Sequence, residues 1–221
     1  MLTMSGIVMT EPRPAYAGRV KYDDKQSGKY QLRKPGKHRA EMRLIARAFK
    51  HIPRKHRVLD IPCGGGRVMI YLARKGYAAS GADLSESMIA IARESISQAR
   101  LSCAVEQQDI EKLTYGNGQF DTIVCFRLFH HFPNVEIRQR VVSELCRVAG
   151  QYVVLSYFSP WSVQSVRRKL SGKDPDRFAT SLSEVEAYFR HAGFRLVEDF
   201  AQMRLLHTLH LAVFKRLDKR K

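Results

Sequence analysis

The sequence predicts an α/β fold with a seven-stranded, mostly parallel sheet, helices on both faces and a C-terminal antiparallel hairpin. Short apolar segments of strand type alternate with amphipathic segments of helical period from residue 38 onwards. Glycine and proline separate these segments. The 221 residues suffice for one α/β domain with its own core, and no apolar run reaches the roughly 18 residues of a membrane span.

The helices and strands follow one another in a regular order. The first helix is expected over residues 38–52, where Met42, Ile45 and Phe49 share one face. Later helices are expected over 65–75, 86–98, 133–147 and from Ser181 or Ser183 to near Gly193. Strands are expected at 57–61, 77–83, 101–107, 120–126, 151–158, 194–200 and 206–214.

Capping residues support several of these boundaries. Ser85 is a suitable N-cap for the helix over 86–98. Gly76 and Gly150 are expected to end the helices that precede them. The last two strands are separated by only a short connection, which indicates an antiparallel hairpin.

The segment VLDIPCGGGR, residues 58–67, places a glycine loop directly after a buried strand. The dinucleotide pattern G-x-G-x-x-G fails because Met69 takes the place of the third glycine, and the Walker pattern is absent. Asp60 would weaken the positive field that a phosphate needs at a helix N-terminus. The loop therefore suits a cationic ligand that its backbone approaches closely.

The same segment resembles the first motif of class I S-adenosylmethionine-dependent methyltransferases. Asp60, Gly64 and Gly66 match that motif, whereas Pro62 stands where the family usually has its first glycine. The resemblance implies that Asp60 and the backbone from Cys63 to Gly66 hold the methionine end of the cofactor. Pro62 would contribute a rigid turn to this cofactor loop.

The segment GADLSESMIAIAR, residues 81–93, resembles the second motif of the family. The resemblance implies that Asp83, at the end of the second strand, accepts hydrogen bonds from both ribose hydroxyls. Leu84 and Met88 would flank the adenine and methionine parts of the cofactor.

Two further segments follow in the family's order. QQDIEKL, residues 107–113, implies that Asp109 meets the adenine amine and Ile110 packs against the ring. FDTIVCFRLFHHF, residues 120–132, resembles the fourth strand and its loop, which brings Phe126 to the cofactor. The late helix resembles that of the small-molecule branch, which includes the ubiquinone and menaquinone C-methyltransferases, and the implied fold is Rossmann-like.

The loop after the fourth strand is the expected place for the methyl acceptor, because ligands bind beyond the carboxyl ends of the strands. His130 and His131 are candidate general bases there, and Arg127 is a candidate contact for an anionic acceptor. The alternatives are a histidine pair that packs the corner after the strand and an arginine on the surface.

Segments outside the cofactor motifs are expected to supply the other substrate contacts. The candidates are Tyr22 and Tyr30 in the N-terminal segment, Phe129 in the acceptor loop and Trp161 after the fifth strand. Scattered surface aromatics are the alternative interpretation. The predicted organisation is a basic tail and lid over 1–37 and a methyltransferase domain over 38–221, with a substrate-side insert at about 159–180.

The charge of the chain is strongly uneven. The formal net charge is +17, and residues 58–137 hold 7 basic against 9 acidic residues, so the flanks carry the whole excess. Such flanks attract polyanions, and contact with an anionic membrane or with RNA is expected, unless the charge serves solubility alone. The four cysteines form no C-x-x-C pair, and neither a metal site nor disulfides are expected.

The sequence thus predicts an enzyme that uses S-adenosylmethionine to methylate a small-molecule or lipid-linked acceptor, anionic or membrane-associated. The expected location is the cytoplasm, with peripheral contact at the inner membrane face. Two alternatives remain open, an RNA methyltransferase and a non-catalytic cofactor-binding protein. The oligomeric state is not predicted.

Overall fold

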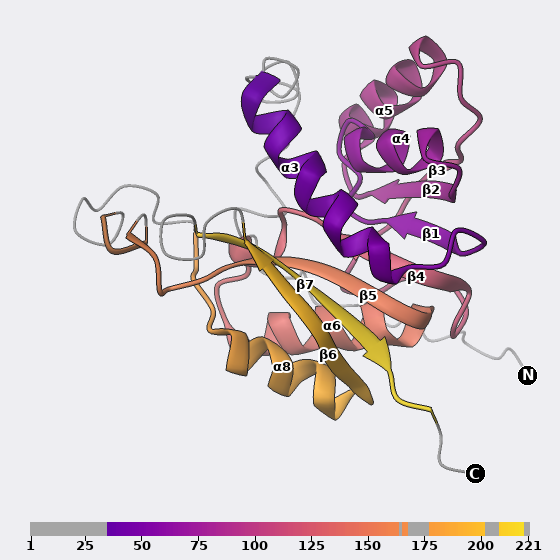
Figure 1. Ribbon diagram of the computed structural model, residues 1–221. Helices are drawn as coiled ribbons and strands as arrows, with labels where there is room; N and C mark the ends of the chain where they lie inside the picture. Colours follow the sequence, from indigo (N-terminus) through magenta and orange to yellow (C-terminus); the bar gives the residue numbers. More distant parts are fainter. Residues whose placement is uncertain (1–34, 164, 168–176, 202–207, 219–221) are drawn as a thin grey trace, which may run out of the picture.

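The computed structural model describes residues 35–163, 165–167, 177–201 and 208–218, and Figure 1 labels its elements. The helices are α3 (Pro35–Ala48), α4 (Arg67–Arg74), α5 (Glu86–Gln98), α6 (Val135–Val148) and α8 (Leu182–His191), with 3-10 turns η1 (Phe49–His51) and η2 (Phe129–His131). The strands are β1 (Arg57–Asp60), β2 (Ala78–Asp83), β3 (Val105–Gln107), β4 (Phe120–Cys125), β5 (Ala149–Phe158), β6 (Phe194–Ala201) and β7 (Leu209–Arg216).

The seven strands form one sheet in the order β3-β2-β1-β4-β5-β7-β6. Strands β1 to β5 pair in parallel, and β7 pairs antiparallel with both β5 and β6. The predicted mostly parallel sheet with an antiparallel C-terminal hairpin is therefore confirmed. The strand order reverses between β1 and β4, and in open α/β sheets the carboxyl ends of two such strands border the crevice in which ligands bind.

Helices cover both faces of the sheet, as predicted (Figure 1). Residues of α3 and α4 share one buried cluster with the β1, β4 and β5 side chains of that face, and α5 joins α4 in a second cluster. Residues of α6 and α8 pack against the opposite face in the largest cluster, where the rings of Phe189 and Phe214 stack with centroids 3.7 Å apart. This packing on both faces fixes the positions of the strand ends at the carboxyl edge.

Local capping sets several helix starts. The hydroxyl oxygens of Ser85 and Ser181 accept bonds from the backbone N–H groups of Met88 and Glu184, which confirms Ser85 and selects Ser181 over Ser183. The Asn134 side chain does the same for α6, so this helix begins at Val135.

Several predicted boundaries differ from the structure. Gly150 does not end α6, because the chain leaves the helix at Ala149 and pairs with Phe120 of β4, so that β5 begins directly. The strand expected over 101–107 is paired only over Val105–Gln107, and the first helix begins earlier than expected, at Pro35.

Candidate cofactor and acceptor site

The glycine loop after β1 turns tightly at the crevice. Gly64 and Gly66 have φ angles of 51° and 81°, in the left-handed region that favours glycine, and the peptide bond before Pro62 is cis. The Gly66 N–H donates to the Cys63 carbonyl at 2.9 Å, and the Cys63 N–H donates to the Ala82 carbonyl of β2 at 2.8 Å. The loop is thereby fixed to β2 before α4 begins.

Asp60 lies at the end of β1, beneath this loop, and is buried. Its Oδ2 accepts a bond of 3.1 Å from the Met69 backbone N–H, whereas its Oδ1 has no hydrogen-bond partner among the described residues. Burial raises the pKa of Asp60 to about 8, against the lowering effects of the Met69 N–H and the Arg67 charge. A buried carboxyl with an unused oxygen suits a ligand that brings positive charge.

Asp83 ends β2 on the other side of the glycine loop. Its Oδ2 accepts a bond of 2.8 Å from the Gly64 N–H, and its Oδ1 accepts one of 3.0 Å from the Ser85 N–H. Burial raises the pKa of Asp83, while these backbone donors oppose the increase. Asp83 therefore joins the glycine loop to the start of α5, and the lone pairs that remain on both oxygens suit a ribose diol.

The expected adenine contacts lie beside Asp83. The Gln108 N–H donates to the Asp83 carbonyl at 2.9 Å, which brings the turn at Asp109 next to the end of β2. The Asp109 Oδ1 accepts a bond of 3.0 Å from the Glu111 N–H. Ile110 and Met88 are buried, whereas Leu84 is exposed.

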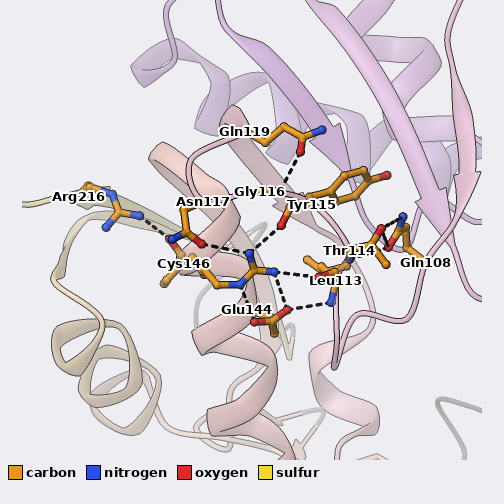
Figure 2. Close-up of polar contacts among 11 residues, drawn as sticks. Gln108, Leu113, Thr114, Tyr115, Gly116, Asn117, Gln119, Glu144, Cys146 and Arg216 are labelled. Atoms are coloured by element: carbon orange, nitrogen blue, oxygen red, sulfur yellow. Dashed lines mark hydrogen bonds and ion pairs between the residues drawn. The ribbon is translucent and has the colours of Figure 1, made fainter. Parts of the chain in front are cut away.

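A polar network holds the far end of the loop that carries Asp109 (Figure 2). The Arg147 guanidinium donates to the carbonyls of Leu113 at 2.9 Å and Tyr115 at 2.7 Å, and the Glu144 carboxylate accepts from the Leu113 N–H at 2.8 Å. Both side chains come from the end of α6, so the loop between β3 and β4 is fixed to that helix. This network thus supports, through the backbone of the loop, the side of the site at which adenine is predicted to bind.

Glu41 of α3 is a functional candidate that the motifs did not identify. Its side chain is buried, and its two oxygens lie 3.1 Å from Arg127 Nη1 and 3.2 Å from Arg67 Nη1. Arg67 follows the glycine loop, and Arg127, with a left-handed φ of 67°, follows β4. Glu41 therefore ties α3 to both the cofactor loop and the acceptor loop, and the Arg127 guanidinium is engaged in this buried ion pair.

The two predicted histidine bases lie in the 3-10 turn η2, and both are buried. The ring of His130 stacks on Phe158, at the end of β5, with centroids 3.7 Å apart and planes 7° apart. Its centroid is 4.3 Å from that of His131, and its carbonyl accepts from the Phe178 N–H at 2.8 Å. The acceptor loop is therefore placed over the carboxyl end of β5, and the roles of both histidines remain predictions.

The predicted substrate contacts occupy different environments. Phe129 is fully buried in the core, whereas Trp161 is 77% exposed beyond β5. Phe126 is buried at the end of β4. Tyr22 and Tyr30 lie outside the described residues. Within the described part of the chain, no group of three or more histidine, cysteine or acidic side chains could hold a metal ion.

The residues at the crevice fit S-adenosylmethionine. The unused Asp60 Oδ1 matches an ammonium or sulfonium group, whose positive charge would favour the ionised form of this buried carboxyl, and Asp83 matches a ribose diol. The predicted cofactor residues of the first two motifs come together around one loop: Asp60, Pro62, Cys63, Gly64, Gly66 and Asp83. The two carboxyls would weaken the binding of a phosphate at the start of α4.

Comparison with known sequences agrees with this site. Residues 58–152 match the methyltransferase domain family. A ubiquinone biosynthesis O-methyltransferase of Coxiella burnetii is 37% identical over 97 residues, which cover 44% of this chain and 41% of that protein. A putative methyltransferase of Bacillus subtilis is 41% identical over 73 residues, or 33% of this chain and 29% of that protein. The chain thus aligns with about two fifths or less of these relatives' own length.

Comparison with solved structures extends the likeness to most of the chain. The magnesium protoporphyrin IX methyltransferase of Synechocystis PCC 6803, solved with bound SAH, has a TM-score of 0.70 at 21% identity, covering 82% of this chain and 84% of that one. The predicted Rossmann-like methyltransferase fold is therefore confirmed. Residues 58–152 are thus similar to the methyltransferase domain family, and the fold of the chain is the Rossmann-like fold of solved S-adenosylmethionine-dependent methyltransferases.

Proposed function

We propose that the protein transfers a methyl group from S-adenosylmethionine to a small-molecule acceptor. The observation that carries this proposal is the pair of buried carboxyls, Asp60 and Asp83, on either side of the left-handed glycine loop. When bound, the cofactor supplies an activated methyl group, so the protein's main contribution is to align the acceptor and exclude water. The match of residues 58–152 to the methyltransferase domain family supports the same activity.

The loop after β4 offers two candidate bases for the methyl acceptor. His130 and His131 lie at the carboxyl end of β5, where the edge of the sheet continues from the crevice. Either imidazole can take a proton near neutral pH if the acceptor arrives protonated. His130→Asn and His131→Asn should then lower turnover while calorimetry shows unchanged affinity for S-adenosylmethionine.

The acceptor is further proposed to be lipid-linked or presented at an anionic membrane. Trp161, Val163 and Val166 are exposed apolar side chains directly beyond the carboxyl end of β5, and the chain carries a formal charge of +17. An exposed tryptophan beside basic residues favours a lipid interface. None of the helices within the described ranges is long and apolar enough to cross a membrane.

A labelled-methyl transfer screen tests the activity, and a binding assay tests the surface. The screen would offer quinone precursors, phenols, glycolipids and RNA with labelled S-adenosylmethionine. Sedimentation with phosphatidylglycerol vesicles should be strong for the native protein and weaker for Trp161→Ser. Transfer to RNA with steep loss of binding at high salt would instead favour the RNA methyltransferase alternative. Cofactor binding without transfer to any acceptor would favour the non-catalytic alternative.

A further inference from the structure

The outer side of α3 carries a row of positive charges. Arg39, Arg43 and Arg47 follow one another at intervals of four residues, so their side chains lie on one side of the helix, about 6 Å apart along its axis. Lys50 follows in η1. All four residues are exposed, and together they are termed the α3 stripe.

The other side of α3 faces the sheet that the helix crosses in Figure 1. Met42, Ile45 and other apolar residues of α3 are buried in the cluster that covers this face of the sheet. Glu41, the one acidic residue of α3, is buried as well and is already paired with Arg67 and Arg127. The α3 stripe therefore points away from the sheet, and no acidic side chain of its own helix offsets its charge.

Contacts within the protein engage only one member of the α3 stripe. The Arg47 guanidinium lies 4.7 Å from the centroid of the Phe200 ring and donates to the Ala201 carbonyl at 3.3 Å. Across the described ranges, the side chains of Arg39, Arg43 and Lys50 form no ion pair or hydrogen bond. These three cations are therefore available to an external partner.

The stability of α3 does not explain the α3 stripe. Like charges four residues apart repel one another and destabilise a helix, and the stripe contains two such pairs, Arg39 with Arg43 and Arg43 with Arg47. The first turn of α3 holds Lys37 and no acidic residue, although the helix dipole favours negative charge there. Solubility alone is served by surfaces that mix both signs of charge. A row of a single sign suits a partner that carries many negative charges.

The spacing and the residue types of the α3 stripe fit a phosphate backbone. A guanidinium binds a phosphate through two parallel hydrogen bonds. The three arginines span about 12 Å of helix, and each strand of a duplex carries a charge about every 3.4 Å along its axis, so each arginine can meet a phosphate. Proteins that bind single strands stack the bases on aromatic side chains, and α3 contains no phenylalanine, tyrosine or tryptophan. A duplex backbone therefore fits the stripe better than unpaired bases do.

A membrane surface fits the α3 stripe less well than a duplex does. A helix that lies on a bilayer inserts its own apolar face among the lipids, whereas the apolar face of α3 is buried against the sheet. The exposed apolar side chains that suit a lipid interface, Trp161, Val163 and Val166, lie beyond β5 instead.

We propose that the α3 stripe binds the phosphate backbone of a nucleic-acid duplex without reading its base sequence. This binding goes beyond the proposed methyl transfer and does not depend on which acceptor is methylated. Glu41 ties α3 to the glycine loop and to the loop after β4. A duplex bound along α3 would therefore lie beside the predicted cofactor site.

The test compares two triple variants that remove the same number of charges. Arg39→Gln/Arg43→Gln/Lys50→Gln removes the three unpaired cations of the α3 stripe and keeps Arg47, which contacts β6. The matched control is a triple variant of exposed arginines at, or directly after, the ends of α4, α5 and α8: Arg74→Gln/Arg100→Gln/Arg190→Gln. Fluorescence anisotropy measures binding of a labelled DNA duplex of about 20 base pairs, without cofactor, between about 50 and 200 mM salt.

The stripe variant should lose affinity and salt dependence together. Its dissociation constant at low salt should rise about tenfold or more, and the slope of log K against log salt should fall by about 2–3. The single variants Arg39→Gln and Arg43→Gln should each lower the slope by about 0.9, so the result does not depend on the triple variant. The control variant should bind the duplex nearly as tightly as the native protein.

Three results would overturn the proposal. They are a native protein that does not bind the duplex, equal losses in the two triple variants, and a stripe variant that keeps its duplex affinity but no longer sediments with phosphatidylglycerol vesicles. The second result would assign the binding to net charge alone, and the third would assign α3 to a membrane surface. Failure of the native protein to bind S-adenosylmethionine would reject the methyltransferase function and leave duplex binding, which is measured without cofactor, unaffected.

Discussion

Glu41 Oε1 lies 3.1 Å from Arg127 Nη1 and connects α3 to the loop after β4, 86 residues further along the chain. The second oxygen of Glu41 holds Arg67 at the start of α4. One buried carboxylate thus fixes the two loops between which a methyl group would pass. The positions of both loops should therefore depend on this one side chain.

Glu41→Gln should destabilise the protein and loosen both loops. Removing one partner of a buried ion pair leaves the other charge uncompensated, and we expect a loss of about 3 kcal/mol in the free energy of unfolding. Urea denaturation measures this loss, and calorimetry should show weaker S-adenosylmethionine binding. The control Glu136→Gln changes an exposed carboxylate and should shift stability by less than about 0.5 kcal/mol. Equal effects of the two substitutions would contradict the role of Glu41.

Asp60 should release a proton when the cofactor binds. Burial raises the pKa of Asp60 to about 8, so the folded protein holds this carboxyl mostly protonated at pH 7. A cationic ligand favours the ionised form, and binding at pH 6.5–7 should therefore expel a proton. Calorimetry in two buffers of different ionisation enthalpy measures the number of protons released. Asp60→Asn should bind more weakly and lose the buffer dependence.

The Asp60 carboxyl should also make the stability of the ligand-free protein depend on pH. The folded-state pKa lies above the value of about 3.9 for an unfolded chain, so the folded state binds the proton more tightly. The stabilising contribution of the Asp60 carboxyl is complete below the pKa of the unfolded chain, and it declines as the pH rises towards the folded-state pKa of about 8. The melting temperature of the native protein should fall between pH 5 and pH 8 relative to that of Asp60→Asn. If the difference in melting temperature between the two proteins stays constant from pH 5 to pH 8, Asp60 is ionised in the folded protein.

Asp83→Asn should weaken cofactor binding more than it weakens the fold. The backbone N–H groups of Gly64 and Ser85 each donate to one Asp83 oxygen. In the asparagine variant the side-chain NH2 would face one of these two donors. The ribose would also lose a carboxylate acceptor. We expect the dissociation constant for S-adenosylmethionine to rise about tenfold to a hundredfold. Asp121→Asn is the matched control, because Asp121 also accepts from a backbone N–H, that of Arg57, but at the opposite end of the strands. If both variants bind equally well, the ribose is held elsewhere.

Local sequence patterns were sufficient to predict most of the fold and to select residues that come together around the glycine loop, whose contacts with the cofactor remain predictions. Ser85 caps α5 as predicted, because an N-cap acts within three residues of its own position. Asp60 and Asp83 could be located because each ends a predicted strand and lies in a segment that resembles a family motif. Glu41 could not, since its partners lie in other elements and no local period marks it.

The predicted end of α6 at Gly150 was wrong because it, too, depends on a contact with a distant part of the sequence. Gly150 has the residue type that ends helices, but Ala149 already pairs with Phe120 in the sheet. Strand pairing between segments that are distant in the sequence overrides the local preference of glycine. The acceptor side is also the part of the site that departs most from family motifs, so its residues gave weaker sequence signals.

Glu144→Gln should destabilise the loop that carries Asp109, and only above acidic pH. The Arg147 side chain, through its hydrogen bonds, lowers the pKa of Glu144, so the ionised carboxylate stabilises the folded state. That contribution is present above the unfolded pKa of about 4.3 and is lost as the pH falls through the lower, folded value. At pH 7 we expect a loss of about 1–2 kcal/mol, which should shrink below pH 4. A difference that persists at pH 3 would assign the effect to packing.

Gly81→Ala should displace the glycine loop through a steric contact from β2. A Cβ atom at this position would lie 2.9 Å from Met69 Sδ and 3.0 Å from Cys63 Sγ, closer than such atoms pack. Both neighbours are buried, so relief requires a shift of the loop or of α4, at a cost of about 1–3 kcal/mol. Calorimetry should show weaker S-adenosylmethionine binding together with a lower melting temperature. Gly36→Ala, where nothing lies within 4 Å of the added atom, should preserve both, and preserved binding in Gly81→Ala would show that the loop tolerates displacement.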